Sequence, residues 1–409
     1  MSSLAGARRV KAAAVLLSLV VAGCAMQPLP GQAPTLGLEP VPMTSLPGWQ
    51  TDRVDAGLVA FQAACERILT LPADQRLGGA GIAATLGGTA GLWQPACTAA
   101  RAVPPGNEAA TRAFLARSLQ AYRVSAGGNP AVLFTGYFEP EVAGSLRETA
   151  HDDTPLYGRP PDLVQADLGD FAQDLAGRII AGRVRDGRLE PYFTRAEITA
   201  GALQDQHLAI AWLADPVSAF VLQIQGSGRI RLPDGEIVRV GFAGENGRPY
   251  VPIGRILADR GDIPKNDISL QTIVAWLEAH PAQAQEVMDQ NPSYDFFRIL
   301  PGLPPDEGPP GALGVPLSPG RALAVDRRYI PLGAPVWVAT TDPDTRKPLQ
   351  RLMVAEDIGG AITTPLRADI FFGWGDQAEA SAGRMDADGA EYVLLPRPPA
   401  PQSPAAPSS

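Results

Sequence analysis

The chain of 409 residues contains only three cysteines and three histidines, so two common sources of catalytic chemistry are poorly supplied. The histidines are scattered, and no cluster of histidine, cysteine and carboxylate residues has the spacing of metal ligands. A zinc hydrolase or a catalytic triad built on histidine is therefore not expected. No metal and no cofactor is predicted.

Positive charge is also in short supply. The chain has 34 Lys and Arg against 43 Asp and Glu, a formal net charge of −9, which disfavours nucleic acid as a partner. Hydrophobic residues make up 45% and charged residues 19%, as in ordinary globular proteins. After removal of both tails, a chain of this length suggests two domains, or one domain with a large insertion.

The apolar run at residues 12–22 is too short to cross a bilayer, which takes about 20 residues. It follows three basic residues within positions 8–11 and ends in Gly23-Cys24, so residues 1–23 resemble a bacterial lipoprotein signal peptide. The resemblance implies lipidation of Cys24, and Ala25 after it favours the periplasmic side of the outer membrane. The alternative is an ordinary signal peptide that happens to end near a cysteine.

Both ends of the mature chain are rich in proline. Residues 24–48 carry few charges and are interpreted as an extended tether, and residues 396–409 as a disordered tail. The two remaining cysteines, Cys65 and Cys97, form an even pair in an oxidising compartment, which indicates a disulfide. The alternative is two buried free thiols.

The hydrophobic pattern predicts mixed secondary structure, with short β segments and few helices after residue 311. Such short strands between Gly and Pro turns suggest a small barrel. We expect helices at 57–70, 107–122 and 267–279, a strand at 131–138, and two strands within 217–240 joined at Pro233-Asp234-Gly235.

Three aspartates in this C-terminal stretch are candidate catalytic residues: Asp326, Asp357 and Asp369. Asp357 ends an apolar strand just before two glycines, which let backbone approach a ligand closely. Asp369 precedes Ile370-Phe371-Phe372, and apolar surroundings keep a carboxyl group protonated, as a general acid for glycosidic cleavage requires. The alternative is that each aspartate only caps a turn.

The stretch from Gly311 to Gly375 looks like the 3D domain, named for three aspartates. Four upstream motifs occur with it in the expected order, so the chain from about residue 45 to 395 resembles membrane-bound lytic murein transglycosylase A. These motifs are Gly136–Pro140, Gln223–Gly228, Gly241–Gly247 and Asn291–Phe297. The chain has Thr363-Thr364-Pro365 where the family usually has a glycine, so we expect the form of that loop to differ.

The resemblance implies a mainly β fold with some helix. A double-psi β-barrel is expected from residues 49–133 and 299–395, with a second β domain inserted at 134–298 and a glycan groove between them. It also implies that Asp369 is the catalytic acid/base, with Asp357 and Asp326 close by. Candidate substrate-binding residues, from these motifs and from polar or aromatic faces, are Gly136, Tyr137, Gln223, Gln225, Ser227, Asn246 and Trp374.

A lytic transglycosylase needs only one carboxyl group, because the C6 hydroxyl of N-acetylmuramic acid replaces water as the nucleophile and a 1,6-anhydro end forms. Glu139 is a rival acid, although a structural role at a strand end is equally compatible with its position. Two other functions stay open: a peptidoglycan hydrolase that uses two aspartates and water, and a non-catalytic peptidoglycan-binding lipoprotein. The sequence also leaves open any partner among cell-wall synthesis or division proteins.

Overall fold

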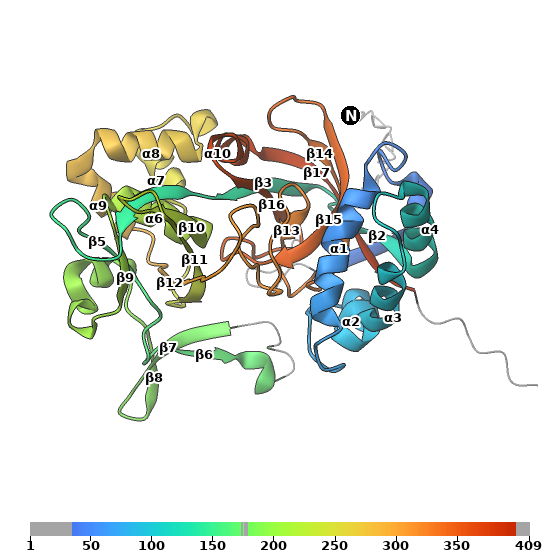
Figure 1. Ribbon diagram of the computed structural model, residues 1–409, viewed down its shortest axis with the longest axis horizontal. Helices are drawn as coiled ribbons and strands as arrows, with labels where there is room; N and C mark the ends of the chain where they lie inside the picture. The colour runs from blue at the N-terminus through green and yellow to red at the C-terminus, as the bar shows by residue number, and fades with distance from the viewer. Residues whose placement is uncertain (1–34, 173–174, 176–178, 398–409) are drawn as a thin grey trace, which may run out of the picture. The chain divides into compact units, whose positions relative to one another are not determined.

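A computed structural model describes residues 35–172, 175 and 179–397 of the chain. The predicted signal peptide with Cys24, and residues 398–409 of the predicted tail, lie outside the described residues. Within them, no helix is both long enough and apolar enough to cross a membrane. Three sheets, of eight, six and three strands, organise the described chain (Figure 1).

Six strands close into a barrel that contains all three candidate aspartates or the turns next to them. The pairing runs β17-β14-β15-β13-β16-β3, and β3 pairs again with β17 to complete the ring. β3 runs parallel to β16, and β13 runs parallel to β15. The barrel strands are β3 (Val132–Glu139), β13 (Ala322–Ala324), β14 (Pro335–Thr341), β15 (Pro348–Asp357), β16 (Arg367–Trp374) and β17 (Asp386–Pro396).

The predicted tether enters the fold earlier than the sequence suggested. Residues Leu36–Val41 form β1, which pairs antiparallel with β2 (Leu119–Ala126) along its whole length. Met43 and Leu46 behind it are buried in the same core as the barrel. The interpretation of 24–48 as a tether is therefore wrong from residue 36 onward, because this segment extends the sheet.

The predicted helix at 107–122 also ends early. It is α4 (Glu108–Ser118), and Asn107 caps it by accepting a hydrogen bond from the backbone of Ala110, 2.9 Å away. From Leu119 the chain pairs with both β1 and β17, so the two sheet partners override the helical stripe that continues to Tyr122.

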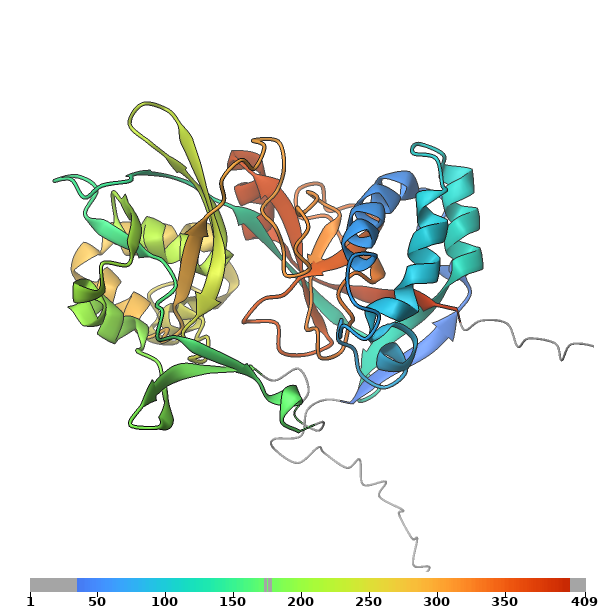
Figure 2. The same ribbon diagram turned by 60° about the horizontal axis from the view of Figure 1, so that its bottom comes forward.

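Four helices pack together against the barrel, and both views show them side by side in blue to cyan (Figures 1 and 2). Cys65 and Cys97 are joined by a disulfide, which links the first and third of these helices. Asp52, just before the first, accepts hydrogen bonds from Arg321 and from the backbone of Leu352, so the packing includes buried charge. The helices are α1 (Val54–Ile68), α2 (Ile82–Gly87), α3 (Ala90–Arg101) and α4.

The segment from β4 to β12 forms a second lobe, the insert lobe, which contains more helix than the term β domain implies. Its main sheet has the order β12-β11-β10-β4-β9-β5, and a smaller sheet has the order β6-β7-β8. The strands are β4 (Glu141–Ser145), β5 (Thr154–Tyr157), β6 (Val164–Asp167), β7 (Ile179–Arg185), β8 (Arg188–Pro191), β9 (Ala209–Leu213), β10 (Ser227–Arg231), β11 (Ile237–Glu245) and β12 (Asp295–Ile299). Its helices include α5 (Arg195–Glu197), η4 (Ile198–Ala202), α6 (Pro216–Gln225), α7 (Ile253–Arg260), α8 (Leu270–Ala279) and α9 (Pro281–Asp289).

The first of the two strands predicted within 217–240 begins only at Ser227, because the residues before it form a helix, α6. Asp215 caps its start by accepting from the backbone of Ser218, Pro216 occupies the first turn, and Gly226 ends it with a left-handed conformation at φ 76°. The predicted hairpin then follows, with β10 and β11 paired antiparallel around the Pro233-Asp234-Gly235 turn.

Candidate active site

Neighbouring strands bring two of the three aspartates together. Ala324 of β13 pairs with Asp357 of β15 on one side and with Asp369 of β16 on the other. Adjacent strands lie about 4.8 Å apart, so the two aspartate backbones are separated by only about 10 Å. The register of β15 shifts by one residue between Ala355 and Asp357, and such bulges re-aim side chains beside active sites.

The carboxyl group of Asp369 is held by one of its two oxygens. Oδ1 accepts a hydrogen bond from the hydroxyl of Thr135 on β3 and another from Nε of Arg367, at 3.3 Å. Within the described part of the chain, Oδ2 has no hydrogen-bond partner, and the side chain is 18% exposed. One oxygen is thus fixed while the other is free to exchange a proton with a substrate.

The contacts of Asp369 differ from the apolar surroundings that the sequence suggested. Ile370 and Phe371, which follow it in β16, are buried in hydrophobic clusters of the barrel. The carboxyl group itself meets a hydroxyl and a guanidinium. Alternation along the strand turns Ile370 to the opposite face. Phe371, two residues after Asp369, packs on the ring of Tyr137 instead, with 5.2 Å between the ring centroids.

Both carboxyl oxygens of Asp357 are occupied. Oδ2 accepts from the Tyr137 hydroxyl at 2.9 Å, and Oδ1 accepts from the backbone N–H of Ala312 at 2.9 Å. Burial raises the pKa of Asp357 to about 6, and these hydrogen bonds limit the rise. Burial also raises the pKa of Tyr137 well above its usual value, and the negative charges of Asp357 and Asp369 add to the effect. Tyr137 therefore stays a neutral donor to Asp357 and lies within electrostatic reach of both aspartates.

Asp326 has a different environment from the other two aspartates. Only 6% exposed, it accepts from the backbone N–H and from Nε of Arg328, at 3.0 and 2.9 Å. The same arginine donates to the backbone carbonyl of Thr363 at 2.8 Å. Asp326 thereby orients an arginine that holds the loop between β15 and β16. No hydrogen bond in the described chain joins it to Asp357 or Asp369.

Three of the predicted substrate-binding residues have structural contacts. Asn246 is fully buried and donates to the backbone carbonyls of Phe193 and Pro292, both at 2.8 Å. A side chain on Gly136 would come within 2.8 Å of the Cα of Ala382, so this glycine allows α10 (Asp376–Arg384) to pack on β3. Gln223 is buried on α6. Each of the three residues thus has a role in the packing of the fold, and direct contact with glycan stays a prediction.

The alternating amide face predicted for residues 220–225 does not exist, because the segment is helical. Gln223 accepts from Arg195 within the insert lobe, whereas Gln225 accepts from the backbone N–H of Phe138 at 3.0 Å, next to Tyr137. Ser227, at the start of β10, is 7% exposed. These three polar side chains therefore have separate surroundings.

Glu139, the rival acid, is a buried ion-pair partner. It has no exposed surface, and Arg229 and Arg239 both donate to it at 2.7–2.9 Å. Arg229 also lies over the ring of Trp374, 4.3 Å from its centroid, so this candidate sugar-stacking residue contacts a guanidinium. A carboxylate locked between two arginines is unsuited to donate a proton.

The sequence interpretation missed Thr135 and Arg367. Arg367 stands two residues before Asp369 on the same strand, so strand alternation places both on one face and could have revealed it. Thr135 is 234 residues away in sequence and meets Asp369 only because β3 and β16 pair in that register. Among the described residues, no group of three or more His, Cys, Asp or Glu side chains is placed to hold a metal ion.

Two regions of the chain match models of known domains. Residues 133–298 match the MltA specific insert domain, and residues 321–395 match the 3D domain. Membrane-bound lytic murein transglycosylase A of Escherichia coli (strain K12) is 34% identical over 274 residues, which are 65% of this chain and 66% of that protein. The aligned region thus spans about two thirds of the length of this relative.

Solved structures extend the likeness over most of the chain. The membrane-bound lytic murein transglycosylase from Agrobacterium tumefaciens is 33% identical and superposes with a TM-score of 0.77, covering 88% of this chain and 98% of that one. E. coli MltA with bound chitohexaose is 28% identical, with a TM-score of 0.62 and coverage of 90% and 95%. With both domains matched and the fold shared nearly end to end, the chain belongs to the membrane-bound lytic murein transglycosylase A family.

Proposed function

We propose that this enzyme cleaves the β-1,4 bond between N-acetylmuramic acid and N-acetylglucosamine in peptidoglycan and leaves a 1,6-anhydromuramic end, with Asp369 as its single acid/base. Its relatives are named lytic murein transglycosylases, and one of them is solved with bound chitohexaose. The observation that carries the assignment is the unequal state of the two neighbouring aspartates. Asp369 has one free oxygen, whereas both oxygens of Asp357 are engaged.

The mechanism transfers two protons, and Asp369 takes part in both transfers. Asp369, protonated at Oδ2, gives its proton to the glycosidic oxygen as the bond from that oxygen to C1 of N-acetylmuramic acid breaks. The resulting carboxylate takes the proton of the C6 hydroxyl as the C6 oxygen bonds to C1, and Asp369 is again protonated. The nucleophile belongs to the same sugar ring, so its effective concentration is very high and water is not required.

Asp357 and Thr135 have positioning roles in this proposal. Asp357 fixes the hydroxyl of Tyr137 and the backbone at Ala312 around the site, and Thr135 directs Oδ2 of Asp369 outward by holding Oδ1. Gln225 and Trp374 stay candidates for contact with the glycan, because both lie next to residues of this site.

The analysis of products distinguishes this mechanism from hydrolysis. Purified peptidoglycan digested in ¹⁸O-labelled water should give anhydro ends, one water lighter than reducing ends and free of label. Label at the cleaved C1 would show that water is the nucleophile, and the single-carboxylate mechanism would then be wrong. A chain that binds strands without any turnover would be the non-catalytic alternative.

The anchor proposal rests on the sequence at Cys24 and on the relatives, which are named membrane-bound. Lipid on Cys24, with Ala25 after it, would hold the enzyme at the periplasmic face of the outer membrane. Cys24→Ala, or treatment with globomycin, should block maturation or release the protein from the membrane fraction. Normal processing and unchanged membrane association of the variant would count against this anchor.

A further inference from the structure

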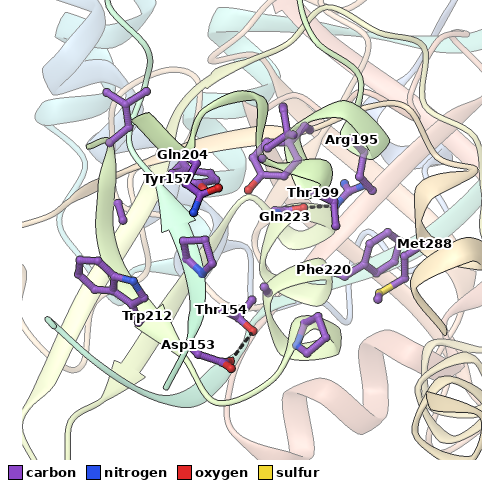
Figure 3. A pocket seen from close by; sticks show the side chains of 18 of the residues that line it. Asp153, Thr154, Tyr157, Arg195, Thr199, Gln204, Trp212, Phe220, Gln223 and Met288 are labelled. Carbon is purple, nitrogen blue, oxygen red and sulfur yellow. Dashed lines mark hydrogen bonds between the residues drawn. The ribbon is translucent and has the colours of Figure 1, made fainter. Parts of the chain in front are cut away.

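A pocket of about 690 Å³ in the insert lobe has no role in the mechanism above (Figure 3). Its walls come from β5, β9, η4, α6 and α9, and none of the residues that line it belongs to the barrel. The volume is in the range of small-ligand sites. Asp326, Asp357 and Asp369 do not line it, so a ligand here would bind apart from the catalytic aspartates.

The floor of the pocket carries a buried arginine. Arg195 is 4% exposed and donates to the backbone carbonyls of Asn291 and Ser293 and to the side chain of Gln223. Figure 3 shows the bond to Gln223 as a dashed line beside Thr199. A guanidinium has five N–H groups, and these bonds use three of them. Two N–H groups therefore have no hydrogen-bond acceptor within the described chain.

Arg195 also lacks the carboxylate partner that the comparable arginines have. Of the arginines that the structure describes, three are buried, and two of them, Arg229 and Arg239, share Glu139. No carboxylate of the described residues forms an ion pair with Arg195. A buried charge without a partner is costly, and burial accordingly lowers the pKa of Arg195.

The nearest carboxyl groups do not supply that charge. Asp295 and Asp289 act on Arg195 only at longer range. Burial, together with the charge of Glu245, raises the pKa of Asp295 well above its usual value, which favours its neutral form. Asp289 accepts from Gln285 at 2.9 Å. The rings of Phe220 and Tyr294 lie over the guanidinium, 4.7 and 5.2 Å from its carbon, but neither ring carries a full negative charge. A ligand carboxylate could supply that charge.

The mouth of the pocket has the opposite charge. Glu148 and Asp153 line it and are exposed. Tyr157, Phe220 and Met288 also line the pocket and offer apolar surface, with the ring of Phe220 next to the guanidinium of Arg195. A matching ligand has a carboxylate at one end, an ammonium group at the other and apolar atoms between them.

We propose that this pocket binds a short peptide through its free carboxylate, which pairs with Arg195, and through an ammonium group, which faces Glu148 and Asp153. Resting on the proposed function, the peptide class is that of peptidoglycan stem peptides, which end in a carboxylate and carry diaminopimelate. The same chemistry can arrive as a free peptide or as a peptide attached to glycan. The pocket would let the enzyme sense or select the stem while the barrel handles the sugar.

Calorimetric titration of the mature protein tests the carboxylate contact. The free tetrapeptide L-Ala-D-Glu-mDap-D-Ala should bind, and its C-terminal amide should bind about 10-fold or more weakly, since hydrogen bonds to charged groups are worth about 1.5–3 kcal/mol. Equal affinity for acid and amide, or no binding of the acid, would overturn the proposal. A disaccharide-tetrapeptide arm separates the sources: tighter binding than the free peptide points to glycan-attached stems, and weaker binding points to free peptide.

Variants at the mouth avoid disturbing the buried arginine. Asp153→Asn should weaken tetrapeptide binding several-fold but should not change the affinity for an analogue acetylated on the diaminopimelate amine. Glu236→Gln, an exposed site in the β10–β11 turn, is the matched control and should change neither. If Asp153→Asn binds both peptides as the wild type does, the ammonium contact is wrong.

The catalytic proposal is tested separately in the same preparation. Asp369→Asn should still bind the tetrapeptide, and Asp153→Asn should still cleave glycan strands from which the peptides have been removed. Peptide binding without glycan cleavage by the wild type would reject the proposed function and leave the pocket standing. Glycan cleavage without peptide binding would reject the pocket proposal and leave the proposed function standing.

Discussion

Thr135 and Asp369 are partners on the adjacent parallel strands β3 and β16, and the threonine hydroxyl donates to Oδ1 of the aspartate. Thr135 precedes the insert lobe and Asp369 follows it, 234 residues later in the chain. Closure of the barrel through β3 is thus what completes the surroundings of the acid. The pairing separates the roles of the two oxygens, since Oδ1 is held and Oδ2 can act.

Asp369→Asn keeps the size and much of the hydrogen bonding of the side chain but can neither give nor regain the proton. Loss of general acid/base catalysis costs about 10²–10⁴-fold. Because one group serves both half-reactions, we expect turnover of peptidoglycan to fall at least to the upper end of that range. Anhydromuropeptide release measures the rate, and binding to insoluble murein should persist.

Asp376→Asn, at an exposed position at the start of α10, is the control and should retain activity. Glu139→Gln tests the rival acid, but it also leaves Arg229 and Arg239 with reduced charge compensation, so its folding must be checked by circular dichroism. If Glu139→Gln is folded but inactive while Asp369→Asn is active, the acid is Glu139 and the assignment to Asp369 is wrong.

Thr135→Val removes the hydroxyl that holds Oδ1 while it preserves the shape of the side chain. A lost hydrogen bond to a charged group is worth about 1.5–3 kcal/mol, so we expect kcat to fall about 10-fold or more with little change in KM. Steady-state kinetics on soluble glycan oligomers separates the two constants. Thr135→Ser should recover most of the rate, and a Ser variant as slow as the Val variant would argue against the positioning role.

Local signals in the sequence identified the two aspartates of the site but did not identify the residues that surround them. Asp357 and Asp369 stand out because apolar strand residues and glycines flank them, and the structure places both beside Ala324. Thr135 has no local signal, since its contact depends on the pairing of strands separated by the whole insert lobe. A pattern along one strand cannot report the register of a partner so distant in sequence.

Segment 220–225 shows how one local signal can mislead when others are ignored. Its alternation of apolar and polar residues predicts a strand, and that prediction misplaced Gln223 and Gln225. The cap at Asp215, the proline at position 216 and the glycine at 226 were all readable as a helix start and stop. Given those boundaries, the same residues fit a ten-residue helix with Leu222 and Gln223 buried.

The disulfide between Cys65 and Cys97 should stabilise the helical layer on the barrel. It closes a loop with a sequence separation of 32, for which the chain-entropy relation gives about 3–4 kcal/mol. Cys65→Ala with Cys97→Ala should therefore lower the free energy of unfolding by about that amount in urea titrations. Thiol labelling of the denatured, unreduced protein should find neither cysteine free, and stoichiometric labelling of both would contradict the bond.

Glu391 on β17 is a carboxyl group that the barrel buries without a partner for Oε1 among the described residues, and burial raises its pKa to about 8. Since the pKa of the folded state lies above that of the unfolded state, near 4.5, folding favours the protonated form. At low pH the group is protonated in both states and does not reduce the free energy of unfolding. That free energy falls as the pH rises from about 4.5 to 8.

Glu391→Gln removes this titration while it keeps the shape of the side chain. The wild type should lose stability between pH 5 and pH 9, whereas the variant should not lose it through this group. We therefore expect the free energy of unfolding of the variant, relative to that of the wild type, to rise by on the order of a few kcal/mol over this range. Urea titrations of both proteins at the two pH values measure the difference, with the exposed Glu236→Gln as the matched control. The comparison between pH values cancels any cost that the amide itself imposes on the barrel. If the wild type and Glu391→Gln keep the same stability difference at pH 5 and pH 9, the carboxyl group of Glu391 does not titrate in this range.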